Sequence, residues 1–431
     1  MKLTSSSTTL LRSGIGLTLA APVSLLAAGI ELYEIATPDV GLASAGYASR
    51  AQDASTVFKN PAGMNLLVGT QVQAGLQLTY GDVEFSPNSD TSARLGTENG
   101  GNAVGALPAL SLFYVQELGE KWRVGFGTLS YFGLLQNYDD NWVGRYYVQE
   151  GGVVGVSLMP TISYEVNDWL SVGAGLNAMY GYMKNELAVN NLDPLIGDGQ
   201  LSLSDRTWGF GANAGVMIRL SEKTRVGATY LSRVNLDFED TPTFSNLGPG
   251  LSGLLANTSQ LNLGVTVPQS VMASVYHQLT EKLAVMVDLG WQNWEQFGQV
   301  QVGVDAPVTT PEDPKAFTTN LNYQDTWHGA VGVQYQLSEK WQLTSGVAYD
   351  SSAVSDEDRT VTVPMGKALR VGLGVQWQFS PKLSLGAAYE FLWAGDMSVD
   401  QGKDDSLRGR VAGSYDNAWF SFFTLNLNWK L

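Results

Sequence analysis

Residues 370–379 read RVGLGVQWQF, a stretch in which polar or small residues alternate with apolar ones. Successive side chains of an extended strand point to opposite faces, so the odd-numbered residues here form an apolar face and Arg370 lies on the polar one. The same division recurs at 283–291 and at 419–430. Strands with one apolar and one polar face are typical of a transmembrane β-barrel, which has lipid outside and a polar lumen inside.

Short turns and long connections alternate along the chain after residue 69. The short turns, several of which resemble LSEKW, lie at 118–122, 166–170, 220–224, 279–283, 337–341 and 379–383. The long connections, which are polar or rich in glycine, lie at 86–106, 133–151, 189–200, 239–261, 297–324, 352–365 and 398–417. Six short turns and seven long loops predict an all-β, antiparallel barrel of about 14 strands at residues 70–431. The strand centres are expected near residues 77, 113, 127, 159, 177, 211, 231, 270, 288, 332, 346, 373, 389 and 424.

Composition supports this class of protein and excludes others. No segment after residue 28 approaches the roughly 20 continuous apolar residues of a membrane-spanning helix. The chain has 12 Trp, 18 Tyr and 15 Phe but only 15% charged residues, which suits a lipid-facing surface with aromatic girdles. A formal charge of −16 argues against nucleic acid as a partner, and the absence of cysteine excludes thiolate metal sites. A large secreted β-sandwich or barrel is the alternative.

The first 28 residues have the composition of a signal peptide. Lys2 and Arg12 supply the positive region, residues 15–26 supply the apolar region, and residues 27–29 are small enough for cleavage. We therefore expect an exported protein whose mature chain begins near residue 28. A retained membrane anchor is the other interpretation, but the apolar core is too short for one.

Residues 29–69 are too irregular for a strand. Gly41, Gly46 and Gly63, together with Pro61, interrupt regular structure and let a backbone fold tightly in a confined space. Because this segment is amphiphilic and precedes the first strand, we expect it to lie inside the barrel as a plug.

Four stretches of the sequence resemble the FadL/OmpP1/TodX family. They are AGIELYE at 28–34, the triplet Asn60-Pro61-Ala62, VNDWLSVGAGL at 166–176, and GSYD at 413–416. The resemblance covers essentially the whole mature chain and implies a 14-stranded outer-membrane barrel of a Gram-negative bacterium with an N-terminal hatch. It also implies transport of hydrophobic molecules, typically long-chain fatty acids and in some members aromatic hydrocarbons. We expect a monomer and no cofactor. Asn60, Pro61 and Ala62 then carry the hatch motif, with a simple anchoring turn as the alternative.

Two features depart from the family pattern. The chain ends in Leu431 where outer-membrane barrels usually end in an aromatic residue, and the connection at 189–200 is short. The second departure leaves open whether an external capture groove is built as in the fatty-acid members. The apolar connection at 239–261 supplies candidates for ligand capture, a role that the resemblance implies for Phe244, Leu251, Leu254 and Leu255. Packing of a small loop helix on itself is an equally good interpretation.

Apolar residues on the lumen side of the strand pattern are candidates for binding the ligand. They are Met179, Met183, Met286 and Trp294, of which the three thioethers are flexible enough for varied hydrophobic ligands. Contact with the hatch is the other interpretation for all four.

Two basic residues are candidates for binding a carboxylate head group. Arg370 lies on the polar face near one end of its strand, and a guanidinium binds a carboxylate through two parallel hydrogen bonds. A lumen salt bridge to Asp288 or Glu390 is the other interpretation. Lys184 lies near a position where the family has a basic residue, although the period of two places its side chain outward.

The third strand contains Gly125 and Gly127, which permit a kink. In the family, a kink in this strand opens a lateral gap into the bilayer. Outer-membrane lipid and lipopolysaccharide are therefore expected partners besides the hydrophobic ligand.

Enzymatic chemistry has little support in this sequence. His277 and His328 are the only histidines, and neither belongs to a catalytic, phosphate-binding or metal-binding motif. A general diffusion porin and an adhesive barrel are the remaining alternatives, and the plug segment argues against both.

Overall fold

The computed structural model describes residues 31–431 except 192, 194, 256–259 and 306–315. The expected signal peptide, residues 1–28, lies outside the described residues. Within the described part of the chain, no helix combines the length and apolar character needed to cross a bilayer.

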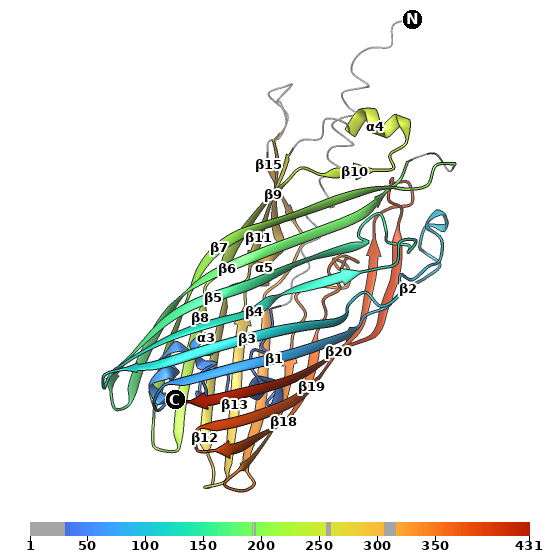
Figure 1. Ribbon diagram of the computed structural model, residues 1–431. Helices are drawn as coiled ribbons and strands as arrows, with labels where there is room; N and C mark the ends of the chain where they lie inside the picture. The colour runs from blue at the N-terminus through green and yellow to red at the C-terminus, as the bar shows by residue number, and fades with distance from the viewer. Residues whose placement is uncertain (1–30, 192, 194, 256–259, 306–315) are drawn as a thin grey trace, which may run out of the picture.

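Fourteen antiparallel strands form a closed barrel, as predicted (Figure 1). The first and last strands, β1 and β20, close it through a ladder that runs from Gln71 with Lys430 to Asp82 with Trp419. The barrel strands are β1(Gln71–Asp82), β3(Gly105–Leu118), β4(Trp122–Asn137), β5(Glu150–Asn167), β6(Leu170–Val189), β7(Gly199–Arg219), β8(Thr224–Leu231), β12(Ser270–Gln278), β13(Leu283–Gln292), β16(Thr326–Gln336), β17(Trp341–Asp350), β18(Ala368–Ser380), β19(Leu383–Gln401) and β20(Val411–Lys430).

The alternation in the sequence corresponds to the two faces of the barrel wall. In β18, Val371 and Leu373 are 49% and 58% exposed on the outer face, whereas Arg370 and Gly372, which alternate with them, point inward and are buried. All six predicted short turns connect consecutive barrel strands. The hydrophobic outer face and paired backbone are what the hydrocarbon region of a bilayer requires.

A second, four-stranded sheet extends beyond the barrel. Its strands are β9(Val234–Asp240), β11(Gln260–Val267), β14(Gln299–Asp305) and β15(Ala316–Asn320), in the order β15-β14-β11-β9. Leu236 and Phe238 are buried against the inward side of β6 and β7, while Asp237 between them is exposed. The connections at 239–261 and 297–324, expected as loops, therefore contain strands. Shorter elements are β2(Phe85–Pro87), η2(Ala93–Leu95), β10(Thr243–Ser245), α4(Pro249–Leu255) and α5(Trp294–Phe297).

Residues 31–69, the N-terminal segment, fold against the inner face of the barrel. The segment contains α2(Thr37–Gly41), α3(Thr56–Lys59) and the 3₁₀ helix η1(Pro61–Leu66), and residues 31–64 are almost all buried. Inward-facing glycines of the barrel make room for its backbone. A side chain at Gly346, Gly372 or Gly227 would overlap the carbonyl of Leu42, Val40 or Ala48, respectively.

Candidate functional site

A break in strand pairing interrupts the barrel wall between β3 and β4. Their ladder ends at Leu112 and Thr128, although β3 begins at Gly105 and β4 continues to Asn137. On the other edge of β4, the register with β5 is irregular between Leu129 and Phe132. Residues 105–111 of β3 consequently pair only with β1.

The position of this break corrects the prediction of a kink at Gly125 and Gly127. Both glycines lie in regular ladders with β3 and β5. A Cβ atom on Gly125 would lie 2.6 Å from Met64 Sδ, so this glycine accommodates the N-terminal segment instead. Gly133 directly follows the irregular pairing of β4 with β5, and its φ of +154° is rarely adopted by other residues.

A cavity of about 910 Å³ occupies the region behind the break. Its lining includes Leu107 and Ser111 on the inward face of β3 and Leu110 on the outward face, where Leu110 is 74% exposed. Val154 and Val156 of β5 also line it from the outward side. The cavity therefore connects the lumen with the lipid-facing surface through the unpaired part of the wall.

The N-terminal segment covers the free edge of β4. The Leu32 amide donates to the carbonyl of Tyr131 over 2.8 Å, and Glu31 forms a bridge with Phe132. Ser270 Oγ donates to Glu31 Oε1 over 3.1 Å. Burial raises the pKa of Glu31 to about 8, so the protonated form is favoured in the docked segment.

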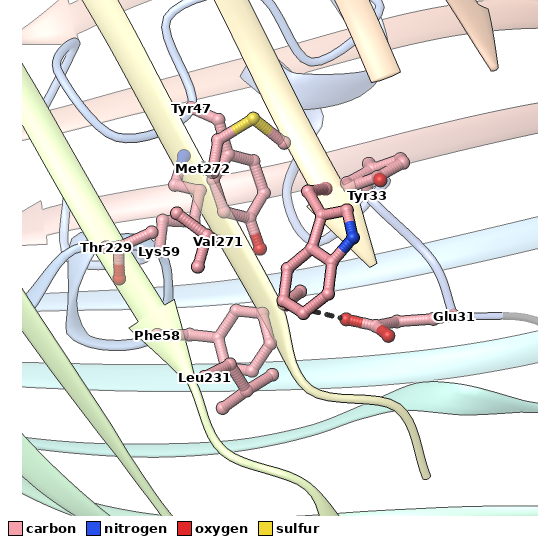
Figure 2. Close-up of a pocket in the computed structure, with 11 residues that line it drawn as sticks. Glu31, Tyr33, Tyr47, Phe58, Lys59, Thr229, Leu231, Val271 and Met272 are labelled. Atoms are coloured by element: carbon pink, nitrogen blue, oxygen red, sulfur yellow. Dashed lines mark hydrogen bonds between the residues drawn. The ribbon is translucent and has the colours of Figure 1, made fainter. Parts of the chain in front are cut away.

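A small void lies beside Glu31, between the N-terminal segment and β8 and β12 (Figure 2). Figure 2 shows Tyr33, Tyr47, Phe58 and Lys59 of the segment around it. Its volume is about 20 Å³, which is room for about one water molecule and not for an organic ligand. The large cavity is thus the candidate site for a ligand.

Arg370 lies at the polar end of the large cavity, surrounded by carboxylates. Its Nε atom is 2.6 Å from Asp350 Oδ2, and its Nη1 atom is 3.3 Å from Glu390 Oε1. The same Nη1 atom forms an ion pair with Glu34 of the N-terminal segment. His328 Nδ1 lies 2.6 Å from the other oxygen of Asp350. The predicted partner Glu390 is therefore present.

The alternative partner, Asp288, is not at Arg370. Its two carboxylate oxygens each accept a hydrogen bond of 2.9 Å, from the backbone amides of Gly46 and Tyr47. Asp288 is buried on the inner face of β13, so the backbone amides of the N-terminal segment satisfy its carboxylate oxygens and hold that turn against the wall.

Asn60 ties two parts of the N-terminal segment to the barrel. Its Nδ2 atom donates to the carbonyls of Ala48 over 2.7 Å and Val216 over 3.0 Å. Its Oδ1 atom accepts the Ala62 amide over 3.1 Å, which caps η1 with Pro61 in its first turn. The triplet is thus a cap and a cross-link in one turn.

Two buried ion pairs fix the fold of the segment itself. Arg50 contacts Asp53 at 2.7 Å, and Lys59 contacts Asp39 at 2.6 Å. Burial alone would raise the pKa of Asp53, but Lys59 and Arg50 beside it bring the pKa below its usual range. Each charge is therefore kept inside the barrel by an opposite one.

The predicted lumen residues are not all brought together. Trp294 lines the large cavity, and its Nε1 atom donates to Gln292 over 2.8 Å. Met286 packs instead against Gly46 and belongs to a buried cluster with Leu42. Met179 and Met183 are buried in the main apolar core and do not line the cavity.

The predicted capture residues lie outside the barrel. Phe244 belongs to β10 and pairs with Leu201 of β7, whereas Leu251, Leu254 and Leu255 belong to α4. Leu251 is buried in the main apolar core, and Phe244 packs against the same core. Of the two whose side chains the structure describes, neither Phe244 nor Leu251 lines the large cavity.

Lys184 lies on the outward side of β6, as the period of two predicts. Its Nζ atom is 2.6 Å from Glu150 and 3.3 Å from Glu186. The structure therefore separates Lys184 from the lumen cavity.

Sequence reasoning missed Glu31, Tyr33, Asp350 and the β3 residues that line the cavity. One signal was available in β3, because Pro108 interrupts an otherwise regular strand and proline is largely confined to sheet edges. Pro108 lies in the part of β3 that has no partner in β4.

Comparison with known proteins identifies relatives of the whole chain. Residues 18–429 match the family model described as outer membrane protein transport protein (OMPP1/FadL/TodX). Outer membrane protein P1 of Haemophilus influenzae is 28% identical over 96% of this chain and 98% of its own. A long-chain fatty acid transport protein of Escherichia coli is 25% identical, covering 95% and 97%. The crystal structure of a Pseudomonas aeruginosa FadL homologue superposes with a TM-score of 0.82 at 20% identity, covering 94% of this chain and 100% of that one.

Proposed function

Because this chain belongs to the OMPP1/FadL/TodX family of outer-membrane transport proteins, we propose that it carries long-chain fatty acids laterally into the outer membrane. The observation that supports this most directly is the cavity of about 910 Å³ with lining residues on both faces of β3. A ligand in the cavity can reach the bilayer without crossing the periplasmic end of the barrel.

Burial of apolar surface drives such a ligand into the cavity. Its lining is mostly apolar, including Leu107, Leu392 and Phe422. Each methylene removed from water contributes about 0.8 kcal/mol, so an acyl chain is held far more firmly than in a water-filled pore. Lateral release costs little, because the ligand exchanges one apolar environment for another.

The N-terminal segment acts as the hatch in this proposal. It blocks the axial route to the periplasm, and Asn60, Pro61 and Ala62 hold it to β7. Since residues 31–32 also cover the free edge of β4, displacement of the start of the segment widens the lateral route.

The extracellular connections supply ligand to the cavity. We assign capture to the apolar surface of β10 and α4, with Phe244, Leu251, Leu254 and Leu255, where lipopolysaccharide surrounds the protein. We propose that the chain acts as a monomer, since all residues that line the cavity belong to one copy.

A second candidate ligand is an uncharged hydrocarbon, and one observation favours it. Arg370 already contacts three carboxylates, so a neutral ligand would fill the apolar cavity without competing for the guanidinium.

Other tests distinguish the proposed transporter from a diffusion porin and from an adhesive barrel. A porin predicts high conductance in planar bilayers, and an adhesin predicts loss of adhesion with unchanged uptake when 239–261 is deleted.

Filling the cavity at the break tests the proposal. We expect Ala109→Trp, which places an indole in the cavity lining, to abolish uptake of radiolabelled oleate by cells that lack their own transporter. Ala106→Trp is the matched control, because Ala106 lies on the outer face of the same strand. Equal uptake by the two folded variants would exclude this route. Parallel uptake of labelled toluene distinguishes the two ligand classes.

A further inference from the structure

We propose that the carboxylate of the ligand displaces Glu34 from Arg370 and thereby unlocks the N-terminal segment. The inference rests on the proposed transport of fatty acids and assigns a coupling role to Glu34. It makes the head group, and not only the acyl chain, the signal for release.

The geometry places Arg370 between the ligand cavity and the segment. Arg370 and Asp350 line the cavity, whereas Glu34 and Glu390 are fully buried behind them. Asp350 and Glu390 belong to β17 and β19 of the barrel wall. Glu34 is the one carboxylate at Arg370 that a movement of the segment can remove.

The carboxyl groups around Arg370 outnumber its single positive charge. Three carboxylates contact one guanidinium, and in a buried site excess charge of one sign is costly. A fourth carboxylate that arrives from the cavity cannot be added without removing or neutralising another. Because the carboxylate of the ligand can accept the hydrogen bonds of the guanidinium in place of Glu34, the exchange has little net cost to Arg370.

The residues next to Glu34 transmit its release to the lateral gap. Tyr33 packs on His328 with ring centroids 4.3 Å apart, and Arg370 lies 5.6 Å from the Tyr33 ring centroid. Leu32 is hydrogen-bonded to β4, at the edge of the break. Loss of the Glu34 ion pair therefore frees residues that both line the cavity and cover its lateral exit.

The N-terminal segment is in equilibrium between a docked state, with Glu34 on Arg370, and a released state. A ligand shifts this equilibrium only if it binds the released state more tightly than the docked one. Oleate does so because its carboxylate needs Arg370. Methyl oleate has the same acyl chain but no negative charge, so it fills the cavity and leaves Glu34 in place.

The chain has no cysteine, so a single introduced thiol reports on the segment. Thr37→Cys is suitable because Thr37 is buried, three residues after Glu34, and its hydroxyl has no hydrogen-bond partner. The measurement is the rate at which a small methanethiosulfonate reagent labels the folded full-length protein. It is made alone, with oleate and with methyl oleate, after binding of each ligand has been verified by equilibrium dialysis.

We expect oleate to accelerate labelling by about tenfold, since charged hydrogen bonds are among the stronger single interactions. Methyl oleate leaves the rate unchanged. In a Glu34→Gln background the rate is high without ligand and insensitive to oleate. Glu165→Gln is the matched control, because Glu165 pairs with Arg219 at 2.7 Å beside a short turn.

The outcomes separate the proposed displacement of Glu34 from the proposed transport of fatty acids. If oleate binds but the labelling rate is unchanged, the proposed displacement of Glu34 is overturned while fatty-acid transport stands. The same conclusion follows if methyl oleate accelerates labelling as much as oleate does. If oleate neither binds nor enters cells, both fall. If Glu34→Gln fails to fold, the comparison of oleate with methyl oleate in the Thr37→Cys protein still tests the displacement of Glu34.

Discussion

Replacement of Asn60 by alanine should release the N-terminal segment without unfolding the barrel. The change removes three hydrogen bonds, two to carbonyls and one from an amide, all at a fully buried position. Each such bond contributes about 0.5–1.5 kcal/mol net, and the bond to Ala62 is also a helix cap. We therefore expect docking of the segment to weaken by about 2–4 kcal/mol.

Hydrogen exchange measured by mass spectrometry reports this loss directly. At about 1.4 kcal/mol per factor of ten, exchange of amides in residues 44–66 should accelerate by about 30-fold to 700-fold. Amides of the barrel strands should keep their protection, because their ladders do not involve Asn60.

A matched asparagine exists at the other end of the molecule. Asn102 also makes three comparable bonds, to the carbonyl of Gly81 and from the amides of Val83 and Val104. Asn102→Ala should leave exchange of residues 44–66 unchanged. Exchange in Asn60→Ala within about threefold of the parent would refute the reasoning, because it would show that the triplet does not hold the segment.

Two further predictions concern the same segment. Gly346→Ala should displace the N-terminal segment and accelerate labelling of Thr37→Cys, because the new methyl group would overlap the Leu42 carbonyl. Gly329→Ala is the control, because its methyl group meets open space and labelling should match the parent. Equal labelling rates in the two variants would show that the contact at Gly346 is not tight. Burial raises the pKa of Glu31 from 4.5 to about 8, so docking is strongest below about pH 4.5 and weakens as pH rises through 8. Labelling of Thr37→Cys, corrected for thiol ionisation, should therefore increase from pH 5 to pH 9 in the parent and much less in Glu31→Gln; an identical increase in both would assign the effect to another group.

Most of the barrel could be predicted from its sequence, because lipid on one side and a filled lumen on the other impose a period of two. The turn at 337–341, for example, joins β16 and β17 as its pattern indicates. The second sheet could not be separated from loops in this way. Residues 234–240 alternate as a barrel strand does, and only their packing against β6 and β7 shows that they belong to another sheet.

The site was less predictable, because it depends on which distant residues meet. Arg370 was a candidate from its face of β18, but Glu34 reaches it only through the path of the N-terminal segment. Asp288 was a reasonable partner by strand face, yet the backbone of Gly46 and Tyr47 occupies it. The irregular register of β4 lies between Leu129 and Phe132, beside Gly133, and not at the two glycines where a kink was expected.

The central claim is that the ligand leaves through the break between β3 and β4. Photocross-linking of the full-length protein with a fatty acid that carries a diazirine near its methyl end tests this most directly. The account predicts cross-links to Leu107, Leu110 and Leu135, which line the cavity at the break, and their loss in Ala109→Trp. Cross-links confined to the short turns at the opposite end of the barrel would contradict it, because the ligand would then follow the axis of the barrel past the N-terminal segment.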